Sequence, residues 1–292
     1  MSHHGHCIFC GNWRKITKEH ILPRWLRRTA IAERLPSKNS SFKRMGSQTH
    51  PGAPPVYATY NKTSGGSFLT RTAAVACGQC NSGWMSDSDN VTKPILLDLI
   101  FGHARSLSLD DQKSLAAWVC LKSIVNAYYG LRFGKSPTVQ DYIAVAVTDR
   151  RYLMERRLAP ENWAINISHI TGQRWQARWF RYSLHVSSVQ SDSGEWVPVF
   201  GNGDEPSNCQ ATTFGIGQFL FHSLRWGDEH LKITAPSDGS GANRIWPQST
   251  SALSWPLVPS ITDDMADEIA TALYKTARRS NPHLTPLLDS PN

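Results

Sequence analysis

The feature that most constrains this chain is a pair of CxxC sequences that lie far apart. Cys7 and Cys10 stand near the first residue, and Cys77 lies 67 positions after Cys10, with Cys80 completing the second pair. Two thiolates separated by two residues can bind one Zn²⁺ from a single tight turn, and two such turns complete a tetrahedral site. The first residues lack the pattern of a secretory signal, so the paired cysteines indicate metal ligands and not disulfides. We therefore predict one structural zinc ion held by all four.

The composition indicates a folded chain with room for two domains. The 292 residues are 40% hydrophobic and include 11 Trp, which is enough apolar material for a core. No apolar run approaches the roughly 20 residues that cross a bilayer. We therefore expect a cytoplasmic protein.

Positive charge is concentrated in the first quarter of the chain. Residues 1–72 hold twelve Lys or Arg and two acids, whereas residues 73–292 hold 19 basic and 21 acidic side chains. Such asymmetry favours a polyanionic partner for the basic segment. A solvated basic surface that only confers solubility explains the charge equally well, so charge alone leaves both interpretations open.

A second feature, Glu19-His20, lies nine residues after Cys10. A neutral imidazole beside a carboxylate can hydrolyse a phosphodiester, because the imidazole takes a proton from water and the carboxylate holds a divalent cation near the phosphate. Adjacent Glu and His are also common by chance, usually on a surface. Taken alone, this pair therefore predicts little.

A third feature, Asn81, directly follows Cys80, where a bound metal would fix the backbone. An amide oxygen aimed from such a position suits Mg²⁺, which prefers hard oxygen ligands. Asn is also among the residues favoured at a helix N-cap. Both roles stay open at this point.

The pattern of the remaining sequence indicates an α+β protein. Residues 36–67 are rich in Ser, Gly, Pro and Asn and predict a long polar loop. We then expect a strand over 68–76, a helix over 94–103, and a second helix over 108–129 that starts at a capping sequence and is buried nearly all round.

After residue 140 the pattern becomes rich in β-forming residues. The expected elements are strands over 142–147, 163–169, 175–189 and 212–221, followed by a helix over 261–279. We therefore predict a small zinc-centred module at residues 1–92 and a larger α+β domain at residues 93–292, whose sequence predicts no reaction.

The order of these features resembles the four-cysteine, zinc-bearing branch of the HNH (ββα-metal) endonucleases, which includes the phage endonuclease VII. The stretches TKEHILPRWL at residues 17–26 and CGQCNSGWMS at residues 77–86 also resemble uncharacterised bacterial and phage HNH proteins. In that branch zinc pins a hairpin and a helix, an acid and His lie on the first strand, and Asn follows the last cysteine. The resemblance covers residues 7–90.

The resemblance implies an N-terminal ββα-metal module and a role for each matched residue. Zinc would be held by Cys7, Cys10, Cys77 and Cys80. Glu19 and Asn81 would hold a catalytic Mg²⁺ or Mn²⁺, and His20 would activate the water. The last His of the pattern is absent. Asp89 or Asn90 could supply a cation ligand in its place, with Asp89 favoured, although solvated helix residues explain both as well. Glu19 also stands where many relatives carry Asp.

These roles predict a metal-dependent endonuclease that hydrolyses phosphodiester bonds in DNA. Basic side chains near the histidine would contact phosphates without reading sequence. They are Arg14, Lys15, Lys18, Arg24, Arg27 and Arg28. The kind of relatives suggests a role in phage defence, by analogy alone. Separately, the sequence leaves open whether the protein forms a homodimer.

Three other functions fit the same sequence. A zinc-containing module could bind nucleic acid without hydrolysing it, with Glu19, His20 and Asn81 idle. An RNA-cleaving toxin could use the same site. A protein-interaction domain could use zinc only as scaffolding.

Overall fold

Helices and strands are mixed along the part of the chain that the structure describes, so the protein belongs to the α+β class. The structure, a computed structural model, describes residues 4–34, 38–47, 56–65, 68–128, 145–201, 207–231, 240–247 and 251–280. Within these ranges, no helix combines the length and the apolar character needed to cross a membrane.

A three-stranded antiparallel sheet organises the N-terminal segment. Its order is β1 (His4–His6), β2 (Trp13–His20) and β5 (Thr72–Cys77). Between β2 and β5 the chain forms η1 (Arg24–Arg28), α1 (Ile31–Arg34), β3 (Lys38–Ser47), β4 (Val56–Gly65) and η2 (Phe68–Thr70). The strand expected over 68–76 therefore exists but begins four residues later, after a short 3-10 turn.

The expectation of a polar loop over residues 36–67 is wrong for two ten-residue spans. β3 and β4 pair as an antiparallel ribbon, with Lys38 opposite Gly65 and Ser47 opposite Val56. Aromatic and β-branched residues recur through β4, and these residue types favour a pleated strand over a loop. Residues 36–37, 48–55 and 66–67 of the expected loop lie outside the described residues.

Consecutive helical segments begin within the second CxxC pair. They are α2 (Gly78–Cys80), η3 (Asn81–Met85, a π-helical turn) and α3 (Ser86–Phe101). The helix expected over 94–103 thus begins eight residues earlier than predicted. It ends at Gly102, whose φ of +74° suits glycine.

After β6 (Arg105–Leu107), the helix expected near residue 108 is confirmed as α4 (Leu109–Ala127). Ser108 is its N-cap, and the side chains of Ser108 and Asp111 satisfy each other's backbone N–H groups as a capping box. Fourteen residues of α4 are buried. A helix buried on nearly every side must be surrounded by other elements.

A five-stranded antiparallel sheet forms the centre of the second half. Its order is β13 (Asn243–Trp246), β7 (Trp163–His169), β12 (Phe219–Arg225), β11 (Cys209–Ile216) and β8 (Ala177–Leu184). The strand expected over 163–169 is confirmed. The one expected over 212–221 is two strands, because Gly217 has a φ of +57° and turns the chain between β11 and β12.

The remaining described elements flank this sheet. They are α5 (Val147–Arg156), the ribbon of β9 (Val186–Gln190) and β10 (Trp196–Phe200), β14 (Leu253–Trp255) and α6 (Asp263–Ser280). The strand expected over 175–189 is divided between β8 and β9. The expectation of a strand over 142–147 is wrong at Val147, because that residue begins α5. Residues 142–144 lie outside the described ranges. The last helix is confirmed as α6.

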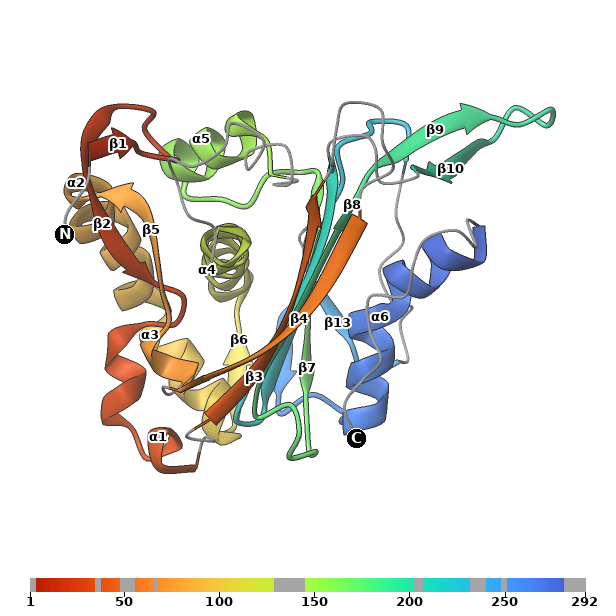
Figure 1. The fold of residues 1–292 in the computed structure, drawn as a ribbon. Coiled ribbons are helices and arrows are strands. Elements are labelled where there is room, and N and C mark those ends of the chain that lie inside the picture. The colour runs from red at the N-terminus through yellow and green to blue at the C-terminus, as the bar shows by residue number, and fades with distance from the viewer. Residues whose placement is uncertain are drawn as a thin grey trace.

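The layers are arranged around α4, which lies between the N-terminal sheet with α3 on one side and the five-stranded sheet on the other (Figure 1). α6 covers the opposite face of the large sheet. One hydrophobic cluster contains Phe9 and Val75 from the N-terminal segment, Leu121 from α4, and Ile165 and Phe221 from the large sheet. The boundary expected after residue 92 falls inside α3.

Candidate functional site

The first CxxC pair is held in a tight turn against β5. The backbone N–H of Gly11 donates to the carbonyl of Cys7 at 2.9 Å, and Gly11 has a φ of +73°, which glycine adopts readily. The N–H of Ile8 donates to the carbonyl of Val75 at 3.1 Å. Val75 is an extra residue of β5 opposite the step from Thr17 to Lys18, so this bulge brings the turn onto the strand.

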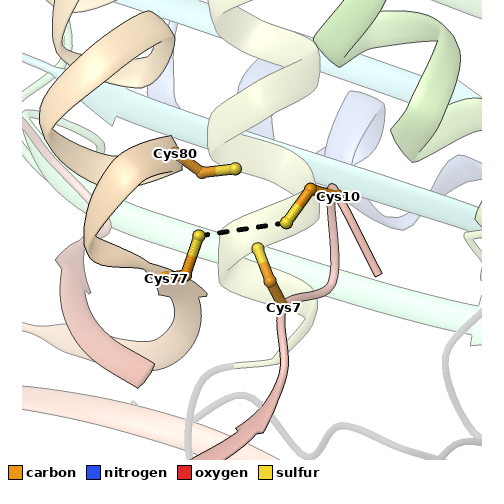
Figure 2. Close-up of side chains that lie close together, drawn as sticks. All are labelled: Cys7, Cys10, Cys77 and Cys80. Carbon is orange, nitrogen blue, oxygen red and sulfur yellow. Dashed lines mark hydrogen bonds between the residues drawn. The ribbon is translucent and has the colours of Figure 1, made fainter. Parts of the chain in front are cut away.

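The four paired cysteines meet at one point, with their sulfur atoms all within 4.8 Å of one another. Figure 2 shows the side chains converging from the N-terminal turn and from the end of β5 with the start of the helix. The Sγ atoms of Cys10 and Cys77 are 3.9 Å apart. Zinc–sulfur bonds of about 2.3 Å place tetrahedral sulfurs about 3.8 Å apart, whereas a disulfide needs about 2.05 Å. The cluster could therefore bind a metal ion such as zinc, as the sequence predicts.

The backbone around Cys7 favours a thiolate. Burial alone would raise the pKa of the Cys7 thiol, but backbone N–H groups at Cys77, Cys10 and Phe9 lower it. Burial instead raises the pKa of Cys80. Four crowded thiols cannot all ionise without a cation among them, so the sulfur set itself fits a metal.

Glu19 and His20 form the last two positions of β2, opposite Ala73 and Thr72 of β5. The Glu19 carboxylate is buried, whereas His20 is half-buried. Alternation along a strand places successive side chains on opposite faces. The two neighbours in sequence therefore have different surroundings.

The partner of Glu19 comes from α4. The ammonium of Lys122, which is 0% exposed, lies 3.1 Å from Glu19 Oε1 and 3.0 Å from Asp89 Oδ1. Lys122 Nζ also lies 3.5 Å from the carbonyl of His20, and the indole N–H of Trp118 donates to Asp89 Oδ1 at 2.8 Å. The structure thus brings together two predicted cation ligands, Glu19 and Asp89, around a lysine.

The charges of this group support one another. Burial alone would lower the pKa of Lys122, but Asp89 and Glu19 raise it. Burial raises the pKa of Glu19, against the effect of the Lys122 ammonium. We assign a charged Lys122, because two carboxylates lie within hydrogen-bonding distance of its nitrogen.

Asn81 fastens the start of the helix to β2. Its Nδ2 donates to Thr17 Oγ1 at 2.9 Å and lies 3.4 Å from the carbonyl of Lys18. Thr17 Oγ1 donates to the carbonyl of Ala76, so it must accept from Asn81, which fixes the orientation of the amide. Asn81 is not the N-cap considered from the sequence, because Cys77 holds that position and Asn81 has helical φ and ψ.

The site surrounding His20 is electropositive. Burial, together with the positive charges of Arg27, Arg24 and Lys122, lowers the pKa of His20 to about 4. The imidazole is therefore neutral at pH 7, with a free nitrogen lone pair.

The six basic residues predicted to contact phosphate are all exposed. Arg14, Lys15 and Lys18 lie on β2, and Arg24, Arg27 and Arg28 lie on η1 directly after it. Arg27 is partly engaged, because its Nε donates to the carbonyl of Leu69 at 3.0 Å. These residues occupy two consecutive elements that flank His20.

The sequence interpretation missed two residues of this group, Trp118 and Lys122. A signal was present, because Lys122 is the only charged residue between Ser114 and Ala127 of a helix that is otherwise apolar or weakly polar. A lysine that is buried needs an acidic partner. The spacing of four places Trp118 and Lys122 on one face of α4.

The set of residues predicted to hold a catalytic divalent cation does not fit one in this arrangement. The Lys122 ammonium lies between Glu19 and Asp89, and the Asn81 amide is fixed through hydrogen bonds to β2. We therefore derive no chemical step through a divalent cation.

The fold and the site define an α+β protein whose N-terminal sheet and following helix are joined at a four-cysteine cluster suited to a metal ion. No protein-family model matches the chain, and no curated protein or solved structure matches it either.

Proposed function

We propose that this protein is an endonuclease of the HNH type that hydrolyses phosphodiester bonds, with His20 as the general base. The observation that carries the proposal is the neutral His20 imidazole at the end of β2, within electrostatic reach of the exposed cations Arg24 and Arg27. This arrangement agrees with the resemblance of residues 7–90 to the zinc-bearing HNH branch.

The electrostatics suit a polyanionic substrate. Exposed Arg24 and Arg27 lie near enough to His20 to lower its pKa, so a phosphate bound by these guanidinium groups would lie close to the imidazole. An anion there would raise the pKa of His20 from about 4 toward neutrality. With substrate bound, the pKa of His20 would therefore lie nearer the working pH, where a general base is most efficient.

The chemistry that we assign to this chain is limited. His20 removes a proton from the attacking water, and the positive charge of the flanking arginines stabilises the charge that develops on the phosphate. Asn81 and the cysteine cluster hold β2 and the helix in register. Zinc, when bound by four thiolates, supplies structure and has no open position for substrate.

The first experiment is cleavage of supercoiled plasmid by the zinc-loaded full chain. The reaction is run with added Mg²⁺, with added Mn²⁺ and with neither of the two. His20→Ala should reduce the nicking rate at least about 100-fold, which lies within the usual contribution of a general base. Zinc content and the far-UV circular dichroism spectrum should not change.

The matched control is His103→Ala, because His103 is a strongly exposed histidine after α3 and outside the site. This variant should cleave as the unmodified protein does. Undiminished nicking by the His20 variant would rule out its role as base. A parallel assay on transfer RNA separates a DNA endonuclease from an RNA-cleaving toxin.

A second function, binding of nucleic acid without hydrolysis, is favoured by one observation. Glu19 is already neutralised by Lys122 and so is not available as a free acid. In that case plasmid would remain intact under all conditions. A duplex would still bind, and its affinity would fall steeply between 50 and 200 mM salt, because counterions are released from the contacted phosphates.

A further inference from the structure

We propose that Lys122 is the resident cation of this site, a positioning residue whose ammonium takes the place between Glu19 and Asp89 that a divalent ion would occupy. The proposal concerns the same site as the proposed function. Its readout is metal binding and does not need cleavage, so the two proposals can fail separately.

The geometry around Lys122 is that of a complete ammonium site. Nζ lies 3.1 Å from Glu19 Oε1, and 3.0 and 3.2 Å from the two oxygens of Asp89. These distances lie within the range of N–H···O hydrogen bonds, whereas Mg²⁺ would require oxygens at about 2.1 Å. The carbonyl of His20 lies at 3.5 Å on the same nitrogen.

Lys122 cannot readily give up this place to a metal ion. Its side chain is 0% exposed and extends from α4, a helix buried in the main hydrophobic cluster. If the ammonium left the carboxylates, it would remain charged within the core, which is strongly unfavourable. A divalent cation beside the ammonium would be repelled by it.

The same contacts give Lys122 a mechanical role. Glu19 lies on β2 and Asp89 on α3, so one nitrogen on α4 joins the strand and the helix that together form the site. Trp118, one turn earlier on α4, donates its indole N–H to Asp89 Oδ1 at 2.8 Å, the oxygen that also lies 3.0 Å from Lys122 Nζ. Residues 118 and 122 therefore fix the end of β2, which carries His20, relative to α3.

The test measures Mn²⁺ binding to the zinc-loaded full chain by the electron paramagnetic resonance signal of free Mn²⁺. The unmodified protein should bind no Mn²⁺ through Glu19 and Asp89. Lys122→Met keeps an unbranched chain as far as the Cε position and removes the ammonium, so two carboxylates are left without their cation. This variant should bind one Mn²⁺ with a dissociation constant at least tenfold lower than that of any Mn²⁺ binding to the unmodified protein. The double variant Lys122→Met with Asp89→Asn should lose that gain.

Two further variants keep the test decisive if Lys122→Met does not fold. Glu19→Gln and Asp89→Asn each leave Lys122 with one acidic partner. If the unmodified protein binds one Mn²⁺ that either variant abolishes, the site holds a divalent ion and the proposal is overturned. Mn²⁺ binding that is absent, or that neither variant changes, supports it. A folded Lys122→Met protein that gains no Mn²⁺ also overturns it.

Discussion

At the scale of single residues, burial decides which titratable groups are charged. Lys122 is fully buried and remains an ammonium because it forms ion pairs with two carboxylates, those of Glu19 and Asp89. His222 is also buried, but its Nδ1 meets only the neutral hydroxyl of Thr213, at 2.8 Å. Burial accordingly lowers the pKa of His222 to about 4. A buried group keeps its charge only where the fold supplies an opposite one.

The lowered pKa values of His20 and His222 predict a loss of stability in acid. Between pH 6.5 and 4 the unfolded chain binds more protons at these histidines than the folded chain does, so the free energy of unfolding falls as the pH falls. For His222 alone the loss between pH 7 and pH 5 is on the order of 2 kcal/mol.

Urea unfolding at pH 7 and pH 5 measures this loss, and His222→Gln removes the titrating group. The variant should lose less stability than the unmodified protein over the same interval. An equal loss in both proteins would mean that His222 does not titrate in this range. His103→Gln is the exposed control and should leave the difference unchanged.

At the scale of elements, the cysteine cluster joins the N-terminal turn to the junction between β5 and α2. The turn of residues 7–10, the end of β5 and the start of the helix all contribute a sulfur atom. β1 and β2 are a short hairpin, and hairpins of this size are marginally stable alone. A metal ion on the cluster therefore couples ligand binding to the folding of the N-terminal sheet.

Cys80→Ser should remove one ligand and with it most of the bound zinc. The N-terminal sheet should lose order, because metal binding and folding are coupled there. Zinc content measured by atomic absorption and a lowered thermal midpoint would show this result.

Cys120→Ser is the matched control for that change. Cys120 is buried in α4 and lies outside the cluster, so zinc should remain while the free energy of unfolding falls by about 1–3 kcal/mol from burial of a hydroxyl. Full zinc content in the Cys80 variant would show that the cluster is not the metal site.

At the scale of the whole molecule, the site depends on α4, which lies beyond the expected module of residues 1–92. α4 supplies Trp118 and Lys122 to Asp89 and Glu19, and the backbone N–H of Gln218 donates to the carbonyl of Ile100 at 3.0 Å. The turn at Gly217 fits closely, since a Cβ there would lie 2.5 Å from that same carbonyl. The five-stranded sheet and α3 are thus in direct contact.

A fragment of residues 1–92 should therefore fail to fold cooperatively even with zinc. It would end within α3, lose the apolar packing against α4 and leave Glu19 and Asp89 without Lys122 as their partner. Dispersed amide resonances and a single sharp thermal transition for the zinc-loaded fragment would contradict this expectation. The full chain measured in the same buffer is the reference.

Local sequence by itself determined the ligand spacing and several of the elements of this protein. The CxxC pairs, the capping box at Ser108 and the strand at residues 163–169 depend on neighbours a few positions apart, which a sequence displays directly. Only the tertiary structure decided that Glu19 is paired with Lys122, 103 positions away, and not free to bind a divalent ion. A charge's partner depends on which distant side chain is buried beside it, and no local pattern records that choice.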